Sequence, residues 1–458
     1  MKKLTLSLLA LLCATLCAAQ TKLCSVYTDN MVLQQNAQVP IWGTSAPMQQ
    51  VTIIASWNTK DTIRTISDNM GEWRAVLKTP KADLAAHTIR CNDLKISNVM
   101  LGEVWLCSGQ SNMEWNVNRG ILNGEQEAAA ATYPYIRICR VPLRASNTPQ
   151  NLVDVKWESC TPESMRATSA VGFFFARSLY KELNVPIGII SSAWGGTPAE
   201  VWIPEEFFTP DMLKNAVTET NNWRPNKPAK AYNQMIHPLV PFTLAGVIWY
   251  QGESNRVWAA HYDNLMKVLI GSWRKLFGNA KLPFYFVQIA PFNYAQNKDT
   301  YAAELREAQQ KTADELANTG MVVVSDLVDD VRNIHPINKQ DVGARLSKFA
   351  LAEVYGKDVK DYKSPTFRSM TVRSDRALIT FNNPTARLIC TGSKIEGFVI
   401  AGADGVFVPA DAKIVGNQIE VWAKGIEKPT QVRYCFDDTT CGNLKTEAGL
   451  PVAPFRSK

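Results

Sequence analysis

An apolar run leads directly into a polar turn at Val104-Trp105-Leu106-Cys107-Ser108-Gly109-Gln110-Ser111-Asn112-Met113. The run Val104–Cys107 predicts a buried strand, and the residues after it predict a sharp turn. A serine just past a strand end, beside a glycine, has an exposed hydroxyl, which is where a nucleophilic serine is useful. A Ser/Asn turn closed by side chain–backbone hydrogen bonds explains the same residues equally well. Ser111 is therefore a candidate nucleophile that the rest of the chain can test.

Residues 1–19 have the features of a secretory signal. Lys2 and Lys3 precede a short apolar core from Leu4 to Leu16, and Cys17-Ala18-Ala19 form a small-residue cleavage site. The apolar core is too short to span a bilayer, and no other stretch is long and apolar enough. We expect an exported protein without a membrane span, either periplasmic or secreted.

The net charge bears on the kind of ligand, and the length bears on the number of domains. The 458-residue chain has a formal net charge of +7, which falls to +5 when the two lysines of the signal are removed. There is no basic cluster, so the excess is compatible with anionic substrates but does not indicate nucleic-acid binding. The length predicts two or three domains around a large core.

Eight cysteines remain after the signal is removed, and export permits disulfides. Cys435 and Cys441 are the expected local pair. None of the eight has the Cys-x-x-Cys spacing of a zinc site, so no metal is expected. Cys107 and Cys390 are interpreted as small buried apolar side chains.

The pattern of polar and apolar residues changes twice along the chain. Residues 20–98 alternate polar and apolar positions between frequent turns, which predicts a small β-sandwich-like domain. Residues 99–355 alternate short apolar strands with helical patterns, which predicts an α/β domain whose parallel sheet has helices on both faces. Residues 356–458 return to short strands and predict a second β-rich region. Ligands of such a parallel sheet bind outside the carboxyl ends of its strands.

Two further predicted strands of the α/β region end in polar or glycine-rich turns. The strand Ile187–Ala193 runs into Trp194-Gly195-Gly196-Thr197-Pro198, where paired glycines let backbone N–H groups approach a ligand. The strand Gly246–Tyr250 runs into Gln251-Gly252-Glu253-Ser254-Asn255. Each segment alone could be a turn that satisfies its own hydrogen bonds.

A serine nucleophile needs a base, and the chain has four histidines: His87, His237, His261 and His335. Only His335 lies after the last predicted strand of the α/β region and before its final helix. That position is at the same sheet edge as Ser111, so His335 is the best candidate base. Four strand ends then carry polar or glycine-rich groups to one edge.

Together these segments resemble the sialate O-acetylesterase family, a branch of the SGNH-type serine hydrolases. The resemblance covers nearly the whole mature chain. It rests on four ordered blocks and on both ends of the chain: Gly109–Met113, Gly195–Pro198, Trp249–Asn255, Ile334–Pro336, Asp29–Gln34, Arg433-Tyr434 and Gly449–Arg456.

The resemblance implies a 9-O-acetylesterase-like enzyme that removes acetyl groups from sialic acids without a cofactor. Ser111 would be the nucleophile and His335 the general base, then acid. The N–H groups of Ser111 and Gly196, with the Gln251 side chain, would form the oxyanion hole, and Asn255 is a further candidate for that role.

One position departs from the pattern of related hydrolases, which place an acid three residues before the histidine. Here that residue is Arg332, and an arginine cannot accept the imidazole N–H. The nearby acids are Asp326, Asp329 and Asp330, of which Asp330 is preferred. A backbone carbonyl could orient the ring instead, which would make a Ser–His dyad.

The expected partner is an O-acetylated sialic acid or sialoglycan. Sugars stack on aromatic rings and carboxylates pair with arginine, although packing or solvation can explain any one such residue. Four residues are candidate sugar contacts: Arg119, Trp115, Trp202 and Tyr232. Glu253 and Arg306 are expected to support the site.

Two alternatives remain open at the level of sequence. The same chemistry could act on acetylated xylan or another glycan, because the motifs define the acetyl ester better than the sugar. A non-catalytic glycan-binding protein could also retain the hydrolase scaffold.

Overall fold

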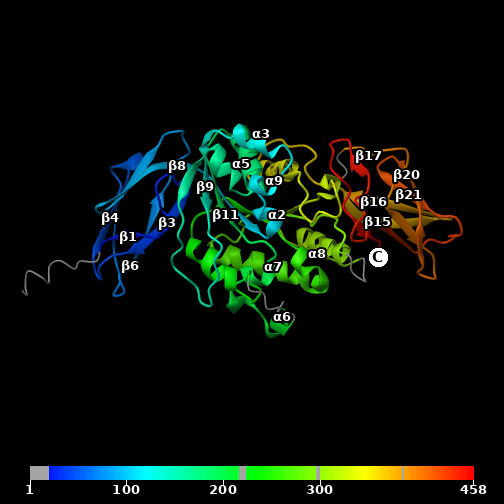
Figure 1. The fold of residues 1–458 in the computed structure, drawn as a ribbon, viewed down its shortest axis with the longest axis horizontal. Coiled ribbons are helices and arrows are strands. Elements are labelled where there is room, and N and C mark those ends of the chain that lie inside the picture. The colour runs from blue at the N-terminus through cyan, green and yellow to red at the C-terminus, as the bar shows by residue number, and fades with distance from the viewer. Residues whose placement is uncertain (1–19, 215, 217–222, 295–299, 384–385, 458) are drawn as a thin grey trace, which may run out of the picture.

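The computed structural model describes residues 20–214, 216, 223–294, 300–383 and 386–457. The predicted export signal, residues 1–19, lies outside the described residues. Figure 1 shows a row of three parts, with a β-rich part in blue at one end, a central α/β part, and a second β-rich part in orange and red. The predicted combination of an α/β core with flanking β-rich regions is confirmed.

The central sheet has seven strands in the order β10-β9-β11-β8-β12-β13-β14. All neighbouring strands run parallel except β10, which pairs antiparallel with β9 at the edge. The sequence analysis did not predict β9 and β10. The strands are β8 (Leu94–Gly109), β9 (Tyr133–Arg140), β10 (Trp157–Cys160), β11 (Ile187–Ala193), β12 (Gly246–Tyr250), β13 (Phe284–Val287) and β14 (Thr319–Val322).

Helices cover both faces of this sheet. Trp105 and Cys107 of β8 belong to one core together with residues of α5 and α9, whereas Val104 and Leu106 belong to a second core with residues of α7 and α8. This alternation follows from the two-residue period of a strand. The helices are α2 (Ser111–Glu114), α3 (Gly124–Ala129), α4 (Pro162–Arg166), α5 (Ala170–Leu183), α6 (Pro210–Lys214), α7 (Ala259–Leu276), α8 (Tyr301–Glu315) and α9 (Lys339–Glu353).

The long strand β8 belongs to the central sheet and to the N-terminal β-rich part at once. Its first residues pair with β7, its middle pairs with β2, and its last residues pair with β11 and β12. The sequence-based boundary between residues 98 and 99 falls inside this single strand. The other N-terminal strands are β1 (Lys22–Leu23), β2 (Val32–Gln34), β3 (Gln38–Thr44), β4 (Gln50–Ala55), β5 (Thr62–Ile66), β6 (Glu72–Lys78) and β7 (His87–Cys91).

The C-terminal part has its own apolar core. Its sheets have the orders β15-β16-β21-β20, β17-β23 and β19-β18-β22-β24. The strands are β15 (Thr366–Arg373), β16 (Arg376–Asn382), β17 (Leu388–Cys390), β18 (Phe398–Ala401), β19 (Phe407–Pro409), β20 (Asp411–Val415), β21 (Gln418–Trp422), β22 (Gln431–Tyr434), β23 (Leu444–Thr446) and β24 (Phe455–Arg456).

The burial and pairing of the cysteines agree only in part with the sequence-based predictions. Cys107 is fully buried, as predicted, whereas Cys390 is only partly buried. Cys435 and Cys441 are free thiols rather than the expected disulfide. The Cys441 Sγ instead lies 3.7 Å from the backbone oxygen of Thr439, within the same turn.

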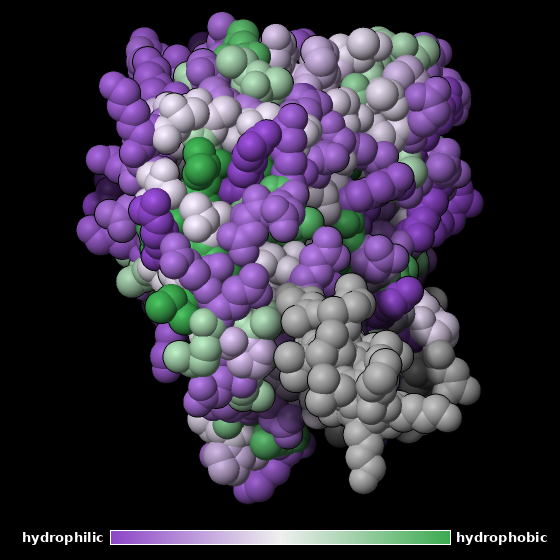
Figure 2. All heavy atoms as spheres, turned by 90° about the vertical axis from the view of Figure 1, so that its left-hand side faces the viewer, coloured by the Kyte–Doolittle hydropathy of each residue, from purple (hydrophilic) through white to green (hydrophobic). Residues whose placement is uncertain are grey.

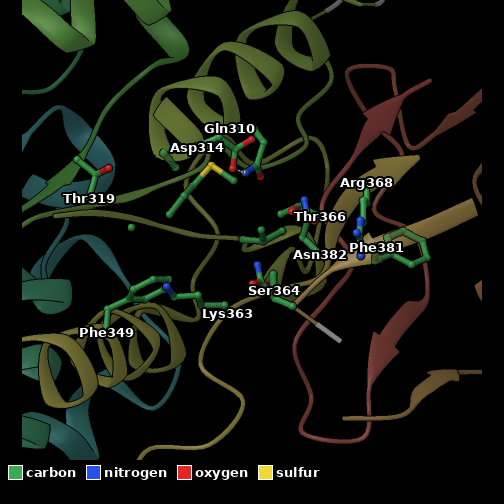
Figure 3. Close-up of a pocket in the computed structure, with 15 residues that line it drawn as sticks. Gln310, Asp314, Thr319, Phe349, Lys363, Ser364, Thr366, Arg368, Phe381 and Asn382 are labelled. Atoms are coloured by element: carbon green, nitrogen blue, oxygen red, sulfur yellow. Dashed lines mark hydrogen bonds between the residues drawn. The ribbon is translucent and has the colours of Figure 1, made fainter. Parts of the chain in front are cut away.

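A cavity of about 530 Å³ lies where the central part meets the C-terminal β-rich part (Figure 3). Gln310 and Asp314 of α8 line one side, and Thr366 and Arg368 of β15 line another. Thr319, which begins β14, also lines it. The cavity therefore lies at the amino end of β14, away from the edge where the strands deliver the predicted site residues.

The face presented by the N-terminal end of the molecule is mainly hydrophilic. Figure 2 shows apolar residues on it as small separate groups rather than one broad patch. Across the described residues, no helix combines the length and the apolar character needed to cross a bilayer.

Close contact between β8 and β12 requires a glycine. A Cβ on Gly246 would lie 2.3 Å from the Trp105 ring, whereas a Cβ on the exposed Gly271 of α7 would meet nothing within 4 Å. We expect Gly246→Ala to lower the free energy of unfolding by about 1–3 kcal/mol through overpacking. The matched change Gly271→Ala should be neutral or stabilise by about 0.5–1 kcal/mol, because alanine favours a helix interior. Urea unfolding of both variants measures the difference, and equal effects would contradict it.

Candidate active site

Ser111 lies at the carboxyl end of β8, the strand at the middle of the sheet. Gly109 pairs with Ala193 of β11 on one side and with Tyr250 of β12 on the other, so three strands end at one level. Gly109 has a φ of 133°, and a Cβ there would lie 2.2 Å from the Tyr250 oxygen. Only glycine fits this turn. The chain then enters α2 with Ser111 as its first residue.

His335 lies opposite Ser111, in the loop between β14 and α9. Its Nε2 is 2.9 Å from the Ser111 Oγ, although 224 residues separate the two in sequence. The His335 backbone N–H donates to the Asn333 Oδ1 at 3.0 Å, which fixes the loop locally. The structure therefore brings together the predicted nucleophile and the predicted base at hydrogen-bonding distance.

The surroundings of His335 favour a neutral imidazole. Burial lowers the pKa of His335 to about 4, and the positive charges of Lys339 and Arg119 contribute in the same direction. A neutral ring has a lone pair on one nitrogen, so it can accept a proton from the Ser111 hydroxyl. His335 is thus in the form that a general base requires over most of the pH range.

The acid expected behind His335 is not Asp330. The Asp330 carboxylate accepts two hydrogen bonds from the Arg332 Nε and one from its Nη2, at 2.8–3.1 Å. Arg332 lowers the pKa of this carboxyl, and both side chains are exposed. The Asp330 carboxylate is thus paired with Arg332, two residues along the chain, and no hydrogen bond joins it to the His335 ring within the described residues, which corrects the prediction.

The other two acids considered are also engaged elsewhere. Asp326 forms a bidentate pair with Arg345 at 2.6 and 2.7 Å. Asp329 accepts from the Ile337 N–H at 3.4 Å. Among the described residues, the only hydrogen bond of the His335 ring is the one to Ser111. The arrangement corresponds to a Ser–His dyad.

Two backbone N–H groups beside Ser111 are available to a ligand. In the described part of the chain, the N–H groups of Ser111 and Gly196 make no hydrogen bond, and both residues line the cavity. Gly196 has a φ of 70°, and a Cβ there would lie 2.5 Å from the Arg224 Nη1. These two donors can form an oxyanion hole.

Gln251 and Asn255 are not part of that hole. The Gln251 Nε2 donates to the Thr197 oxygen at 3.2 Å and to the Asn255 Oδ1 at 2.7 Å, while the Asn255 Nδ2 donates to Glu200 at 2.8 Å. Both side chains are fully buried and neither lines the cavity. Their amides hold the two neighbouring turns together, which corrects the oxyanion prediction for both residues.

Of the four candidate sugar contacts, only Arg119 and Trp115 line the cavity above Ser111. Trp202 is fully buried and its Nε1 donates to the Thr197 Oγ1 at 3.0 Å. Tyr232 is 2% exposed and packs in the same core. The prediction for Trp202 and Tyr232 was wrong because both aromatic rings serve packing.

The cavity has a volume of about 740 Å³ and includes residues that the sequence analysis did not select. Glu114 is one of them: its carboxylate accepts from the Gly195 N–H at 2.6 Å and from the Arg119 Nη2 at 2.5 Å. Its position one helical turn after Ser111 could have identified it from the sequence as a residue of the site. Further lining residues include Trp194, Trp223, Arg224, Arg256, Trp258 and Tyr294.

A buried network lies beneath the dyad. The Asn112 side chain donates to the Glu253 Oε1 at 2.7 Å and to the Ile334 oxygen at 3.0 Å, and it accepts from the Lys339 Nζ at 2.6 Å. Burial raises the pKa of Glu253 and lowers that of Lys339 to about 7. Glu253 therefore supports the site, as predicted from sequence, whereas Arg306 contacts the C-terminal part through the Asp437 oxygen at 2.5 Å.

The comparison with known proteins is consistent with this geometry. The family model described as carbohydrate esterase, sialic acid-specific acetylesterase, matches residues 101–352, more than half of the chain. The chain belongs to this family. It is a carbohydrate esterase, as the sequence analysis predicted from its motifs.

Several relatives are similar over most of their length. Human sialate O-acetylesterase is 32% identical over 403 residues, which cover 78% of this chain and 75% of the human one. The mouse sialate O-acetylesterase is 31% identical and covers 94% of this chain and 93% of its own. A carbohydrate acetylesterase from Xanthomonas citri superposes with a TM-score of 0.86 at 34% identity, over 96% of this chain and 100% of that structure.

The depressed pKa of His335 predicts an unusually acid-tolerant enzyme. The value of kcat/KM should stay level as pH falls and decline only below pH about 4, where the imidazole becomes protonated. Lys339→Met removes a nearby positive charge, so it should raise the His335 pKa and move this decline to higher pH. The measurement is a pH profile of kcat/KM on an acetyl ester.

Lys348→Met, on the same helix α9, is the matched control and should leave the profile unchanged. A wild-type decline centred near pH 6.5, the ordinary histidine value, would contradict the prediction.

Proposed function

We propose that this protein hydrolyses O-acetyl esters of sialic acids through an acetyl-enzyme on Ser111, on an SGNH-type core. The observation that carries the proposal is the 2.9 Å contact between the Ser111 Oγ and the His335 Nε2. The contact lies in a cavity where two backbone N–H groups have no hydrogen-bond acceptor among the described residues, in a chain of the acetylesterase family.

In the first step, the Ser111 Oγ attacks the acetyl carbonyl carbon while the His335 Nε2 takes the hydroxyl proton. The carbonyl oxygen becomes an oxyanion, which the N–H groups of Ser111 and Gly196 stabilise. His335 then gives its proton to the sugar oxygen, and the bond between the acetyl carbonyl carbon and that oxygen breaks. The sugar leaves as an alcohol, and the acetyl group stays on Ser111.

In the second step, water takes the place of the sugar. His335 removes a proton from the water, and the resulting hydroxide attacks the acetyl-serine carbonyl. The same two N–H groups stabilise the second oxyanion. Return of the proton from His335 to the Ser111 Oγ releases acetate and restores the enzyme.

The charge of the cavity supports an acidic sugar. Three arginines line it, Arg119, Arg224 and Arg256, against two glutamates. Both glutamates have partners: Glu114 binds Arg119 and Gly195, and Glu253 binds Asn112. Guanidinium groups suit the carboxylate of a sialic acid, and the mammalian relatives are named sialate O-acetylesterases.

The role of Ser111 can be tested directly. Ser111→Ala should lower acetylesterase turnover by roughly 10⁴-fold or more while the thermal unfolding curve stays the same, because it removes only the nucleophilic oxygen. The control Ser178→Ala, in α5, should leave turnover unchanged. Near wild-type turnover in a folded Ser111→Ala protein would refute the proposed mechanism, and labelling of Ser111 by an organophosphonate would refute a non-catalytic binding protein.

The sugar can be tested with a panel scored by acetate release. We expect kcat/KM to be at least about tenfold higher on O-acetylated sialic acid than on acetylated xylan, because only the first offers a carboxylate to the arginines. The methyl ester of the same sialic acid is the matched control, since it keeps the acetyl group and removes the charge. Preference for xylan, or no loss with the methyl ester, would favour a neutral glycan.

A further inference from the structure

The His335 imidazole needs something to hold its orientation. In serine hydrolases with a triad, a carboxylate performs this task by accepting the second ring N–H. Here Asp330 and Asp326 are paired with arginines, and within the described residues no carboxylate bonds to the His335 ring. A free imidazole can rotate about its bond to Cβ, which would turn Nε2 away from Ser111.

Trp115 lies flat against this imidazole. The ring centroids of Trp115 and His335 are 3.8 Å apart and the two planes differ by 16°, which is a face-to-face stack. The contact covers one face of the His335 ring and so opposes rotation of the ring toward Trp115. The indole face also carries the negative part of an aromatic quadrupole, which attracts a cation such as imidazolium.

Trp115 is itself held firmly by the turn that carries the nucleophile. Its backbone N–H donates to the Ser111 oxygen at 2.8 Å, and its backbone oxygen accepts from the Ala170 N–H at 2.9 Å. Its indole Nε1 donates to the Gly120 oxygen at 2.9 Å. Nucleophile and stacking ring therefore share one short segment, four residues apart.

We propose that Trp115 is a positioning residue that keeps the His335 imidazole facing Ser111, in the place of the missing triad carboxylate. The inference rests on the proposed serine–histidine mechanism. It differs from the role expected from sequence, in which Trp115 binds sugar. The stack fixes the ring plane and favours the imidazolium that forms when His335 takes the Ser111 proton.

The two roles predict different kinetic changes. Trp115→Leu removes the flat ring, so it should lower kcat by roughly 10- to 100-fold and change KM by less than about twofold, because the base is misplaced and the sugar site is not. Trp115→Phe keeps a flat ring and should recover most of kcat. The measurement is steady-state kinetics on an O-acetylated sialic acid and on a small activated acetyl ester.

Trp57→Leu is the matched control, because Trp57 also contacts a histidine, His87, with ring centroids 5.5 Å apart in the N-terminal part. It should leave kcat and KM unchanged. A rise of KM with unchanged kcat in Trp115→Leu would overturn the proposal and restore a sugar-binding role. If the leucine variant does not fold, Trp115→Met fills more of the space without a ring and takes its place.

A double variant shows whether Trp115 acts through His335. In a His335→Ala background, Trp115→Leu should cause no further loss on the activated ester, since there is no ring left to position. An equal loss in both backgrounds would overturn the proposal. Full activity of His335→Ala alone would instead refute the serine–histidine mechanism, so the two failures can be told apart.

Discussion

The Asn112 side-chain amide is the contact on which the site depends. It is fully buried and bonds at once to Glu253, to the backbone of Ile334 and to Lys339. A buried carboxylate and a buried ammonium each need a partner, because an unpaired charge in the interior is strongly unfavourable. The amide supplies a donor to one and an acceptor to the other. The amide thereby joins three segments that are distant in sequence: the Ser111 turn, the turn that contains Glu253, and the chain from Ile334 to Lys339.

This arrangement accounts for the form of the dyad. The network bonds to the backbone oxygen of Ile334, directly before His335, and to the side chain of Lys339, the first residue of α9. Burial is the main cause of the lowered His335 pKa, and the positive charge of the nearby Lys339 acts in the same direction. The Asn112 network thus anchors the chain around His335 and adds to the lowering of its pKa, although no carboxylate bonds to the ring in the part of the chain that the structure describes.

The sequence was informative where local patterns determine structure. Strands β11 and β12 begin and end at the predicted residues, because short apolar runs followed by glycine or polar turns leave few alternatives. Strands β9 and β10 were missed because their apolar positions are interrupted, in β9 for example by Pro134 and Arg137. The placement of Ser111 and His335 at one edge followed from their positions after predicted strands of a parallel sheet, because parallel strands end at the same edge.

The failures concern side-chain partners, which one-dimensional patterns do not contain. Gln251 and Asn255 occupy the expected turn, but their amides point into hydrogen bonds with Thr197 and Glu200. Trp202 lies close to the glycine pair in sequence, yet its ring faces the core. Asp330 is near His335 in sequence, but its carboxylate pairs with Arg332 instead. For Gln251, Asn255 and Trp202 the partner comes from the fold, whereas Arg332 lies two residues from Asp330 and could have been considered from the sequence.

The continuity of β8 has a consequence for how this enzyme can vary. The strand that ends at Gly109, just before Ser111, begins in the N-terminal β-rich part, and its sixteen residues pair with strands of both parts. Insertion or deletion of one residue anywhere along it would turn every later side chain to the opposite face of the sheet. Exchanging the N-terminal part for another fold would therefore require a cut through the strand that leads into the Ser111 turn. Variation in this lineage is therefore expected in the loops around the cavity, while the two parts are inherited together.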